Sequence, residues 1–430
     1  FLPMFLILSF TIGIWILLRY ILKNYRKSAF IISLLLILFF SYGHVYNLVD
    51  DVTVAGLDIG KSRYLLVPYI FSLGVGAYYF IRTTRKLDKA TTITNYITIS
   101  LILIVSVNIA TFYMAGDESF YSEQTFENYF TGMEDTQTAF TQSDKNNFPD
   151  VYYIILDGYA GTNSLKEFLD FNNQEFVTFL NDQGFYVQPQ SFSNYPITPI
   201  SMAATLNMQY INNLADIVGT DVDNMHPAFN LIQENLVMKK FKSKGYTMTS
   251  FGTKVVHLND SEKFDFQYCE NNTLLNNKII NTTLHQSIIG YFVEKVWYQE
   301  QRDKILCGFS ELPEIKNIDG PTFLYAHFNM PHTPYIFSAN GEPVDPSRQS
   351  NLGSHDDVDS YINYLKFANN KIEKLVEQLL ETDNQSIIII QSDHGSGFGL
   401  DWENPTNDML MQKMSNFQAF YLPNGDSDLA

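Results

Sequence analysis

The sequence predicts an α/β protein with a transmembrane region of four helices at its N-terminus. Two observations lead to this fold class. Four long apolar runs precede residue 115. From residue 149 onward, apolar strands alternate with helical segments, which is typical of a three-layer α/β/α domain with a mainly parallel sheet. We therefore predict a transmembrane region over 1–114, a polar juxtamembrane linker over 115–148 and a folded domain over 149–430.

Each apolar run is close in length to the ~20 residues that a helix needs to cross a membrane. The runs cover roughly 1–22, 28–48, 64–82 and 93–114. Within them, the stretches 30–40 and 99–112 contain no charged side chain. A helix that is apolar on every face belongs in lipid, so we predict four membrane spans and not the buried helices of a soluble protein.

The charges indicate how these helices are oriented. Residues 1–114 contain ten Lys and Arg against four Asp, a balance of +6, whereas the remainder contains 18 bases and 42 acids, a balance of −24. Basic connections stay in the cytoplasm. They follow the first and third runs, with Lys23, Arg26 and Lys27 in one and Arg82, Arg85, Lys86 and Lys89 in the other. We predict a multi-pass plasma-membrane protein with its acidic domain outside the cytoplasm, and no nucleic-acid partner.

The folded domain is expected to begin with the β-branched, aromatic strand VYYIILDG at 151–158. Further apolar runs predict strands at 184–189, 247–252, 322–328, 386–395 and 417–423. Apolar residues at three- and four-residue spacing predict helices at 163–183, from near Pro199, at 228–244 and at 357–383. Cys269 and Cys307 can form one disulfide outside the cytoplasm or remain two buried thiols, and the sequence leaves both open.

Acidic side chains end two of the best strands. Asp157 follows IIL, and Asp393 with His394 follows the run SIIIIQS. A single Asp-Gly is commonly only a turn. In a parallel sheet, however, the carboxyl ends of the strands carry the working residues. Two such acids with an adjacent imidazole therefore predict a site for one divalent metal, with Zn, Mn and Mg as the candidates.

A hydroxyl and two histidines extend this candidate site. Thr198 precedes Pro199, where it can cap a helix or serve as a nucleophile near the helix N-terminus, a position that also favours phosphate. Ser201 and Thr205 are the alternatives on the same helix. His327 and His332 lie in HFNMPHTPY, after a strand, and either can protonate a leaving alcohol or hold the substrate.

The ordered motifs ILDGY, TPIS, HFNMPHTP and SDHG resemble the alkaline phosphatase superfamily. The similar branch is that of the membrane-anchored sulfatase-like enzymes, including lipoteichoic acid synthases and phosphoethanolamine transferases, and it covers about residues 149–424. The resemblance implies a sulfatase-like catalytic domain over 149–430 that binds one divalent metal. The implied metal ligands are Asp157, Thr198, Asp393 and His394, with Thr198 as nucleophile and with His332, then His327, in the substrate loop.

Three departures from the family pattern bear on the chemistry. The Cys/Ser-x-Pro-x-Arg motif of hydrolytic sulfatases is absent around Thr198. Asp157 stands where the anchored transferases usually carry Glu. No histidine follows His394, and the chain ends soon after the last strand. We therefore expect either a C-terminally truncated domain or a site with fewer ligands.

The predicted function is metal-dependent phosphoryl-group transfer or phosphodiester hydrolysis through a covalent phospho-threonine. The expected substrate is a lipid headgroup or a cell-envelope glycopolymer, bound by loops within 253–320, and the expected partner is the lipid bilayer. Two alternatives are a sulfuric-ester hydrolase of the same superfamily and a non-catalytic, membrane-anchored binding protein.

Overall fold

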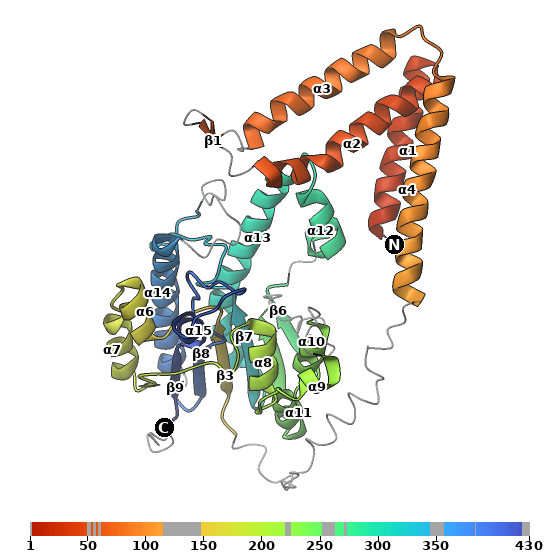
Figure 1. Ribbon diagram of the computed structural model, residues 1–430. Coiled ribbons are helices and arrows are strands. Elements are labelled where there is room, and N and C mark those ends of the chain that lie inside the picture. Colours follow the sequence, from red (N-terminus) through yellow and green to blue (C-terminus); the bar gives the residue numbers. More distant parts are fainter. Residues whose placement is uncertain are drawn as a thin grey trace. The chain divides into compact units, whose positions relative to one another are not determined.

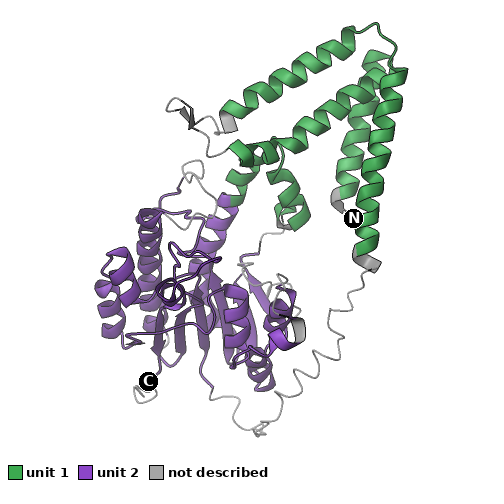
Figure 2. Cartoon of the chain, viewed as in Figure 1, with its two compact units in different colours: residues 1–135, 272–297 green, residues 136–271, 298–430 purple. Residues whose placement is uncertain are grey.

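The computed structural model describes residues 2–49, 53–54, 57–58, 62–114, 148–219, 225–251, 263–270, 273–344, 357–382 and 384–423. The chain forms two compact units (Figure 2). Unit 1 comprises residues 1–135 and 272–297, and unit 2 comprises residues 136–271 and 298–430. The predicted linker over 115–148 lies outside the described residues except for Phe148.

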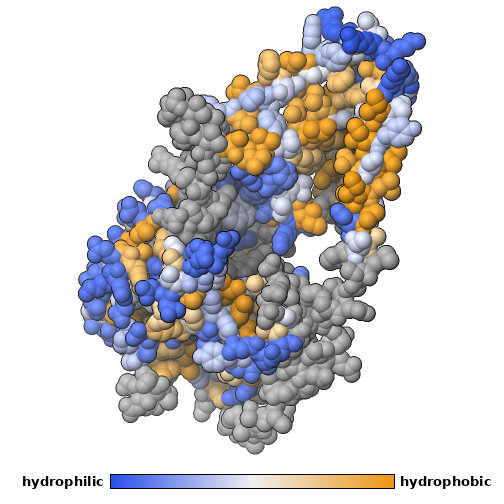
Figure 3. All heavy atoms as spheres, in the orientation of Figure 1, coloured by the Kyte–Doolittle hydropathy of each residue, from blue (hydrophilic) through white to orange (hydrophobic). Residues whose placement is uncertain are grey.

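Four long apolar helices form most of unit 1 (Figure 1). They are α1 (Leu2–Leu22), α2 (Tyr25–Val49), α3 (Ser62–Arg82) and α4 (Asp88–Met114). Each is long and apolar enough to cross a membrane, which confirms the four predicted helices. Orange apolar side chains cover much of them in Figure 3. Arg26 of α2 pairs with Asp88 of α4 at 2.5 Å, so the basic starts of these two helices lie together.

A seven-stranded sheet forms the centre of unit 2, in the order β4-β9-β8-β3-β7-β5-β6. The strands are β3 (Val151–Leu156), β4 (Tyr186–Val187), β5 (Thr247–Phe251), β6 (Phe266–Tyr268), β7 (Thr322–Phe328), β8 (Ile387–Ser392) and β9 (Gln418–Tyr421). The central strand β3 runs parallel to β7 and β8, and the two antiparallel pairings described in this sheet, β4 with β9 and β8 with β9, both involve β9. In this register Leu156 lies opposite Phe328 and Ser392, so three strands end at one level.

Every side chain of β3 and β7 is buried, so both faces of the sheet are covered. Helices provide this cover. This arrangement confirms the predicted three-layer fold. The helices of unit 2 described by the structure are α6 (Thr162–Leu169), α7 (Gln174–Asp182), α8 (Thr198–Leu206), α9 (Leu214–Val218), α10 (His226–Gln233), α11 (Leu236–Ser243), the 3-10 helix η6 (Leu312–Asn317), α14 (Val358–Thr382) and α15 (Asn407–Met414). Helix α13 (Gly290–Glu311) begins in unit 1 and continues in unit 2.

Two predicted helices are each split in the structure. The helix expected at 163–183 breaks at Asp170, which adopts a left-handed conformation with φ of 51° and ends α6. The helix expected at 228–244 breaks at Asn235, whose side chain accepts a hydrogen bond from Met238 N and caps α11. In both cases the apolar spacing continues across a local capping residue, so spacing alone did not reveal the break.

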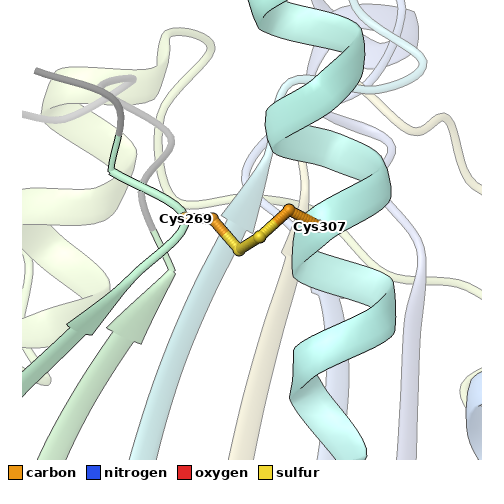
Figure 4. Close-up of a disulfide and its surroundings, with 2 residues drawn as sticks. All are labelled: Cys269 and Cys307. Atoms are coloured by element: carbon orange, nitrogen blue, oxygen red, sulfur yellow. A yellow bond between two sulfur atoms is a disulfide. The ribbon is translucent and has the colours of Figure 1, made fainter.

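The two cysteines form a disulfide that joins the residue after β6 to α13 (Figure 4). This settles the alternative that the sequence left open. Cys269 and Cys307 are the only cysteines of the chain, so both thiols are used. A persistent disulfide is typical of an oxidising compartment.

Candidate metal centre

Asp157 and Asp393 meet because they end the adjacent parallel strands β3 and β8. Both carboxylates are buried. One oxygen of Asp393, Oδ1, accepts hydrogen bonds from the backbone N–H groups of Gly158 (3.0 Å) and His394 (2.9 Å). These two bonds fix the rotation of the carboxylate, so its second oxygen has a defined direction.

The turn after Asp157 is held from two sides. Gly158 adopts φ of +71°, and a side chain there would place a Cβ atom 3.2 Å from Cδ2 of His332. Such a conformation and such a close approach favour glycine. The hydroxyl of Tyr361 in α14 donates to Gly158 O and accepts from Ala160 N, each at 3.0 Å. The position of Asp157 is therefore fixed by its own turn and by α14.

His394 presents one ring nitrogen to the site. Its Nδ1 lies 2.8 Å from the carbonyl oxygen of Gly395, which can only accept, and 3.2 Å from Lys413 Nζ; we assign the proton of the neutral ring to Nδ1 because the carbonyl is the closer partner. Nε2 then holds the lone pair, 3.6 Å from Asp157 Oδ1 and 3.5 Å from Asp393 Oδ2. Burial lowers the pKa of His394 from its ordinary value, which favours the neutral ring. A neutral imidazole with its other nitrogen held by a carbonyl is the form that binds metals.

The hydroxyl of Thr198 faces this ring, with Oγ1 3.1 Å from His394 Nε2. The alternative in which Thr198 caps the helix is wrong. Ile197 occupies the N-cap position of α8, and Thr198 is already in the first helical turn. Ser201 donates its hydroxyl to the carbonyl oxygen of Asp393 at 2.7 Å, so that hydroxyl is engaged in holding the strand end. Of these two hydroxyls, that of Thr198 is the one the fold brings to the metal-facing nitrogen of His394.

The two histidines of HFNMPHTPY occupy different positions. His327, on β7, is buried, with Nε2 3.7 Å from Asp157 Oδ2 and Nδ1 3.2 Å from the Tyr325 hydroxyl. His332 is half-buried and lines the cavity described below. Its Nδ1 lies 2.8 Å from Thr333 O, so Nε2 is the atom that can exchange a proton with a substrate. The fold therefore gives different positions to two candidates that the sequence ranked, His332 before His327, only by resemblance.

Burial alone would raise the pKa of Asp157. The neighbouring rings of His332 and His327 more than reverse this effect, and the pKa lies well below its usual range. Asp157 is consequently a carboxylate at neutral pH. A buried negative charge of this kind requires a cationic partner.

The polar atoms left without partners fit a cation. Among the described residues, Asp157 Oδ1, Asp393 Oδ2 and His327 Nε2 are buried and make no hydrogen bond. Ligand atoms of Asp157, His332 and His394 lie within 4.8 Å of one another, and so do those of Asp157, His327 and Asp393. Carboxylate oxygens and imidazole nitrogens are the donor set that Zn²⁺ and Mn²⁺ accept, and carboxylates suit Mg²⁺. The residues present therefore fit one divalent metal.

A cavity of about 270 Å³ opens beside these ligands. Its lining includes Thr198, His332, His394, Trp402 and Lys413. These residues come from the start of α8, the loop after β7, the segment that follows β8, and α15. The described lining residues therefore do not come from 253–320, the range in which the sequence predicted the substrate-binding loops.

Lys413 is a functional candidate that the sequence analysis missed. It is buried, with Nζ 3.2 Å from His394 Nδ1, and its carbonyl oxygen accepts from Gly395 N at 2.7 Å. Its stem packs on Gly397, where any larger residue would collide with it. Burial lowers its pKa, and the carboxylates of Asp393 and Asp157 oppose that change. A lone lysine on a short helix has no distinguishing pattern in the sequence, so only the fold reveals it.

Comparison with known proteins now identifies the class. Residues 149–413, more than half of the chain, match the family model described as Sulfatase. The chain belongs to the sulfatase family, and its resemblance to the alkaline phosphatase superfamily is confirmed. None of the curated protein sequences compared with the chain matches it significantly.

Several solved structures are similar at low identity. The C-terminal periplasmic domain of EcEptC from Escherichia coli in complex with Zn is 14% identical, with a TM-score of 0.42 over 65% of this chain and 74% of that one. Lipooligosaccharide phosphoethanolamine transferase A from Neisseria meningitidis, an integral membrane protein, is 13% identical, with a TM-score of 0.37 over 89% and 72%. The periplasmic domain of phosphoethanolamine transferase EptC from Campylobacter jejuni is 12% identical, with a TM-score of 0.40 over 65% and 81%.

Proposed function

We propose that this protein is a metal-dependent phosphoryl-group transferase or phosphodiester hydrolase that acts through a covalent phospho-threonine. One observation carries the proposal: the Thr198 hydroxyl lies 3.1 Å from His394 Nε2, at the start of α8 and on the wall of the cavity. A hydroxyl in that place is close to the metal ligands. It also lies where the unpaired N–H groups of a helix N-terminus attract an anionic substrate.

Asp157, Asp393 and His394, together with the Thr198 hydroxyl, would hold one divalent ion, which we propose to be Zn, Mn or Mg. The buried oxygens without hydrogen-bond partners, Asp157 Oδ1 and Asp393 Oδ2, support this assignment. His327 Nε2, which also makes no hydrogen bond among the described residues, lies 3.7 Å from Asp157 Oδ2. When bound, such an ion would lower the pKa of a nearby hydroxyl and neutralise charge that develops on phosphorus-bound oxygens.

The protein's own residues then carry out two displacements. Thr198 loses its hydroxyl proton to solvent, and Oγ1 bonds to phosphorus as the bond from phosphorus to the alcohol oxygen breaks. His332 Nε2 donates a proton to that alcohol. A second alcohol or water then attacks phosphorus and gives its proton to His332, and the Thr198–phosphorus bond breaks. Thr198 Oγ1 then takes a proton back from solvent, and both residues are restored.

The identity of the nucleophile favours a phosphoester substrate over a sulfate ester. Thr198 stands outside any Cys/Ser-x-Pro-x-Arg motif, the sequence that formylglycine-dependent sulfatases require. The proposed substrate is a phosphodiester in a lipid headgroup or in a cell-envelope glycopolymer. We further propose that the plasma membrane is spanned by residues 1–114 and that the extracytoplasmic catalytic domain is formed by residues 149–430. Residues 115–148 would connect the two. The disulfide and the basic connections of unit 1 support this placement.

The test is to incubate the full-length protein, with Zn²⁺ or Mn²⁺ supplied, with bis(4-nitrophenyl) phosphate and separately with 4-nitrophenyl sulfate. We expect nitrophenol release from the phosphodiester and an added phosphoryl mass on the peptide that contains Thr198. Release from the sulfate alone would indicate the sulfuric-ester hydrolase. If neither substrate reacts and no metal binds, the domain is a binding module and the proposal fails.

Lys413 is proposed to contact a non-bridging oxygen of the phosphoryl group, because it brings a lysine side chain to the cavity wall beside His394. We expect Lys413→Met to raise KM for the phosphodiester by about 10- to 100-fold, because the variant loses one charge-assisted hydrogen bond to the substrate. Lys413→Arg should recover part of this loss, because it retains the positive charge. The matched control is Lys240→Met, on the exposed side of α11. Equal KM values in Lys413→Met and wild type would exclude Lys413 from substrate binding.

A further inference from the structure

A segment from within the sulfatase-family match belongs to unit 1. Residues 272–297 lie inside the matched range 149–413, yet they group with the four apolar helices (Figure 2). We call residues 273–297 the insert segment. It contains the 3-10 helix η5 (Leu274–Asn276), α12 (Lys278–His285) and the first turns of α13. Its place in unit 1 raises the question of what its outer surface contacts.

The insert segment binds the backbone of α2 directly. Gly43 N donates to Gln286 O, and Ile288 N donates to Phe39 O, each at 3.0 Å. A side chain at position 43 would put its Cβ atom 2.6 Å from the Cα atom of Gln286, so the approach requires Gly43. These contacts are made in the half of α2 that is remote from its basic start. The insert segment is therefore anchored to the outer half of a proposed membrane span.

Three exposed apolar residues at and just before the start of α13 are followed on the same face by two polar residues. Ile289, Phe292 and Val296 are 38%, 63% and 52% exposed. Their spacing of three and four residues places them in one stripe. The same face continues with Gln299 and Asp303, which are hydrogen-bonded to each other at 2.7 Å, and then with Leu306, which is 39% exposed. The change falls between Val296 and Gln299, where unit 1 also ends in the sequence.

The rest of the insert segment has the composition of a membrane interface. Leu274 and Ile279 expose large apolar side chains at 62% and 65%. Lys295 Nζ lies 4.6 Å from the centre of the Tyr291 ring, and Trp297 is the last residue of the insert segment. Aromatic rings with one polar edge, and lysines with long apolar stems, concentrate where lipid meets water.

We propose that the insert segment is a second membrane anchor, which lies in the lipid–water interface beside the outer end of α2. Ile279, Phe292 and Val296 would enter the acyl region, and Gln299 and Asp303 would remain in water. Two observations favour lipid as the partner: the apolar stripe stops where unit 1 stops, and the segment is hydrogen-bonded to a helix long and apolar enough to span a membrane. Such a segment needs no charge on lipid headgroups, because apolar burial supplies the attraction.

Site-directed spin labelling of the full-length protein tests this proposal. Both native cysteines are in the disulfide, so an introduced cysteine is a unique reactive thiol. We would label Phe292→Cys and Val296→Cys, with Gln299→Cys and Asp303→Cys as matched positions on the same helix face. Each variant is reconstituted in vesicles of phosphatidylethanolamine and phosphatidylglycerol. Electron paramagnetic resonance then measures collision with oxygen, which partitions into lipid, and with a water-soluble nickel chelate.

The ratio of oxygen to nickel accessibility is expected to exceed unity at positions 292 and 296 and to fall below unity at 299 and 303. A nickel accessibility at 292 and 296 equal to that at 299 and 303 would overturn the proposal, because the stripe would then lie in water. Protection of 292 and 296 from both reagents would also overturn it, since a second protein chain would be covering the stripe. The result does not depend on turnover, so it stands or falls separately from the proposed reaction.

Discussion

Thr198→Ala is expected to lower kcat for a phosphodiester by about 10⁴-fold or more, as removal of a covalent nucleophile does in enzymes generally. The variant loses the only atom that could bond to phosphorus in the proposed first displacement. Because Asp157, Asp393 and His394 remain, bound divalent metal should stay close to one equivalent. Turnover and metal content, measured on the same preparation, distinguish loss of the nucleophile from loss of the site.

Two variants serve as controls for this prediction. Thr198→Ser keeps a hydroxyl in place and should retain most of the activity and the phosphorylated peptide. Thr205→Ala makes the same side-chain change further along α8, away from the described ligand cluster, and should behave like wild type. If Thr198→Ala still accumulates a phosphorylated peptide, the nucleophile is another residue, and Ser201 would be examined next.

Asp393→Asn is expected to weaken divalent-metal binding by at least about 100-fold, more than the loss typical of an outer-shell partner, and to abolish turnover. The geometry explains why an isosteric change is so damaging. Oδ1 of Asp393 accepts two backbone N–H groups, so an asparagine must keep its carbonyl oxygen there. Its amide NH₂ then replaces Oδ2, a buried oxygen without a hydrogen-bond partner. A donor group would point at the metal position in place of a negative ligand.

Metal content after dialysis, followed by titration with Zn²⁺, Mn²⁺ and Mg²⁺, measures this effect and identifies the ion that restores wild-type turnover after chelation. Asp182→Asn, an exposed carboxylate at the end of α7, is the matched control and should bind metal normally. Thermal unfolding of both variants without metal shows whether the fold is intact. Wild-type metal affinity in Asp393→Asn would remove Asp393 from the ligand set.

Much of the fold could be predicted because its signals are local. The four apolar helices follow from uninterrupted hydrophobicity over the length of a membrane span, a property of each segment by itself. The central strands β3, β7 and β8 are apolar on both faces, as strands of a covered parallel sheet must be. Breaks at Asp170 and Asn235 were missed, because a left-handed residue or a side-chain cap interrupts a helix without changing its apolar spacing.

The site was partly predictable for a related reason. Asp157, Asp393 and His394 end strands, and parallel strands in register bring their ends together, so strand position implied proximity. The resemblance ranked His332 before His327, but the different positions of the two rings were not predictable. One lies on β7 among the carboxylates and the other lies on the cavity wall, a difference set by how the chain turns after the strand.

The sequence by itself determined the four apolar helices, the α/β domain, the family resemblance and six of the residues at the candidate site. Each depends on a pattern along the chain. Only the tertiary structure placed Lys413 beside His394, joined Cys269 to Cys307 and grouped the insert segment with α2. These are contacts between residues distant in sequence. Their partners are selected by packing and by backbone hydrogen bonding across the fold, which no local pattern records.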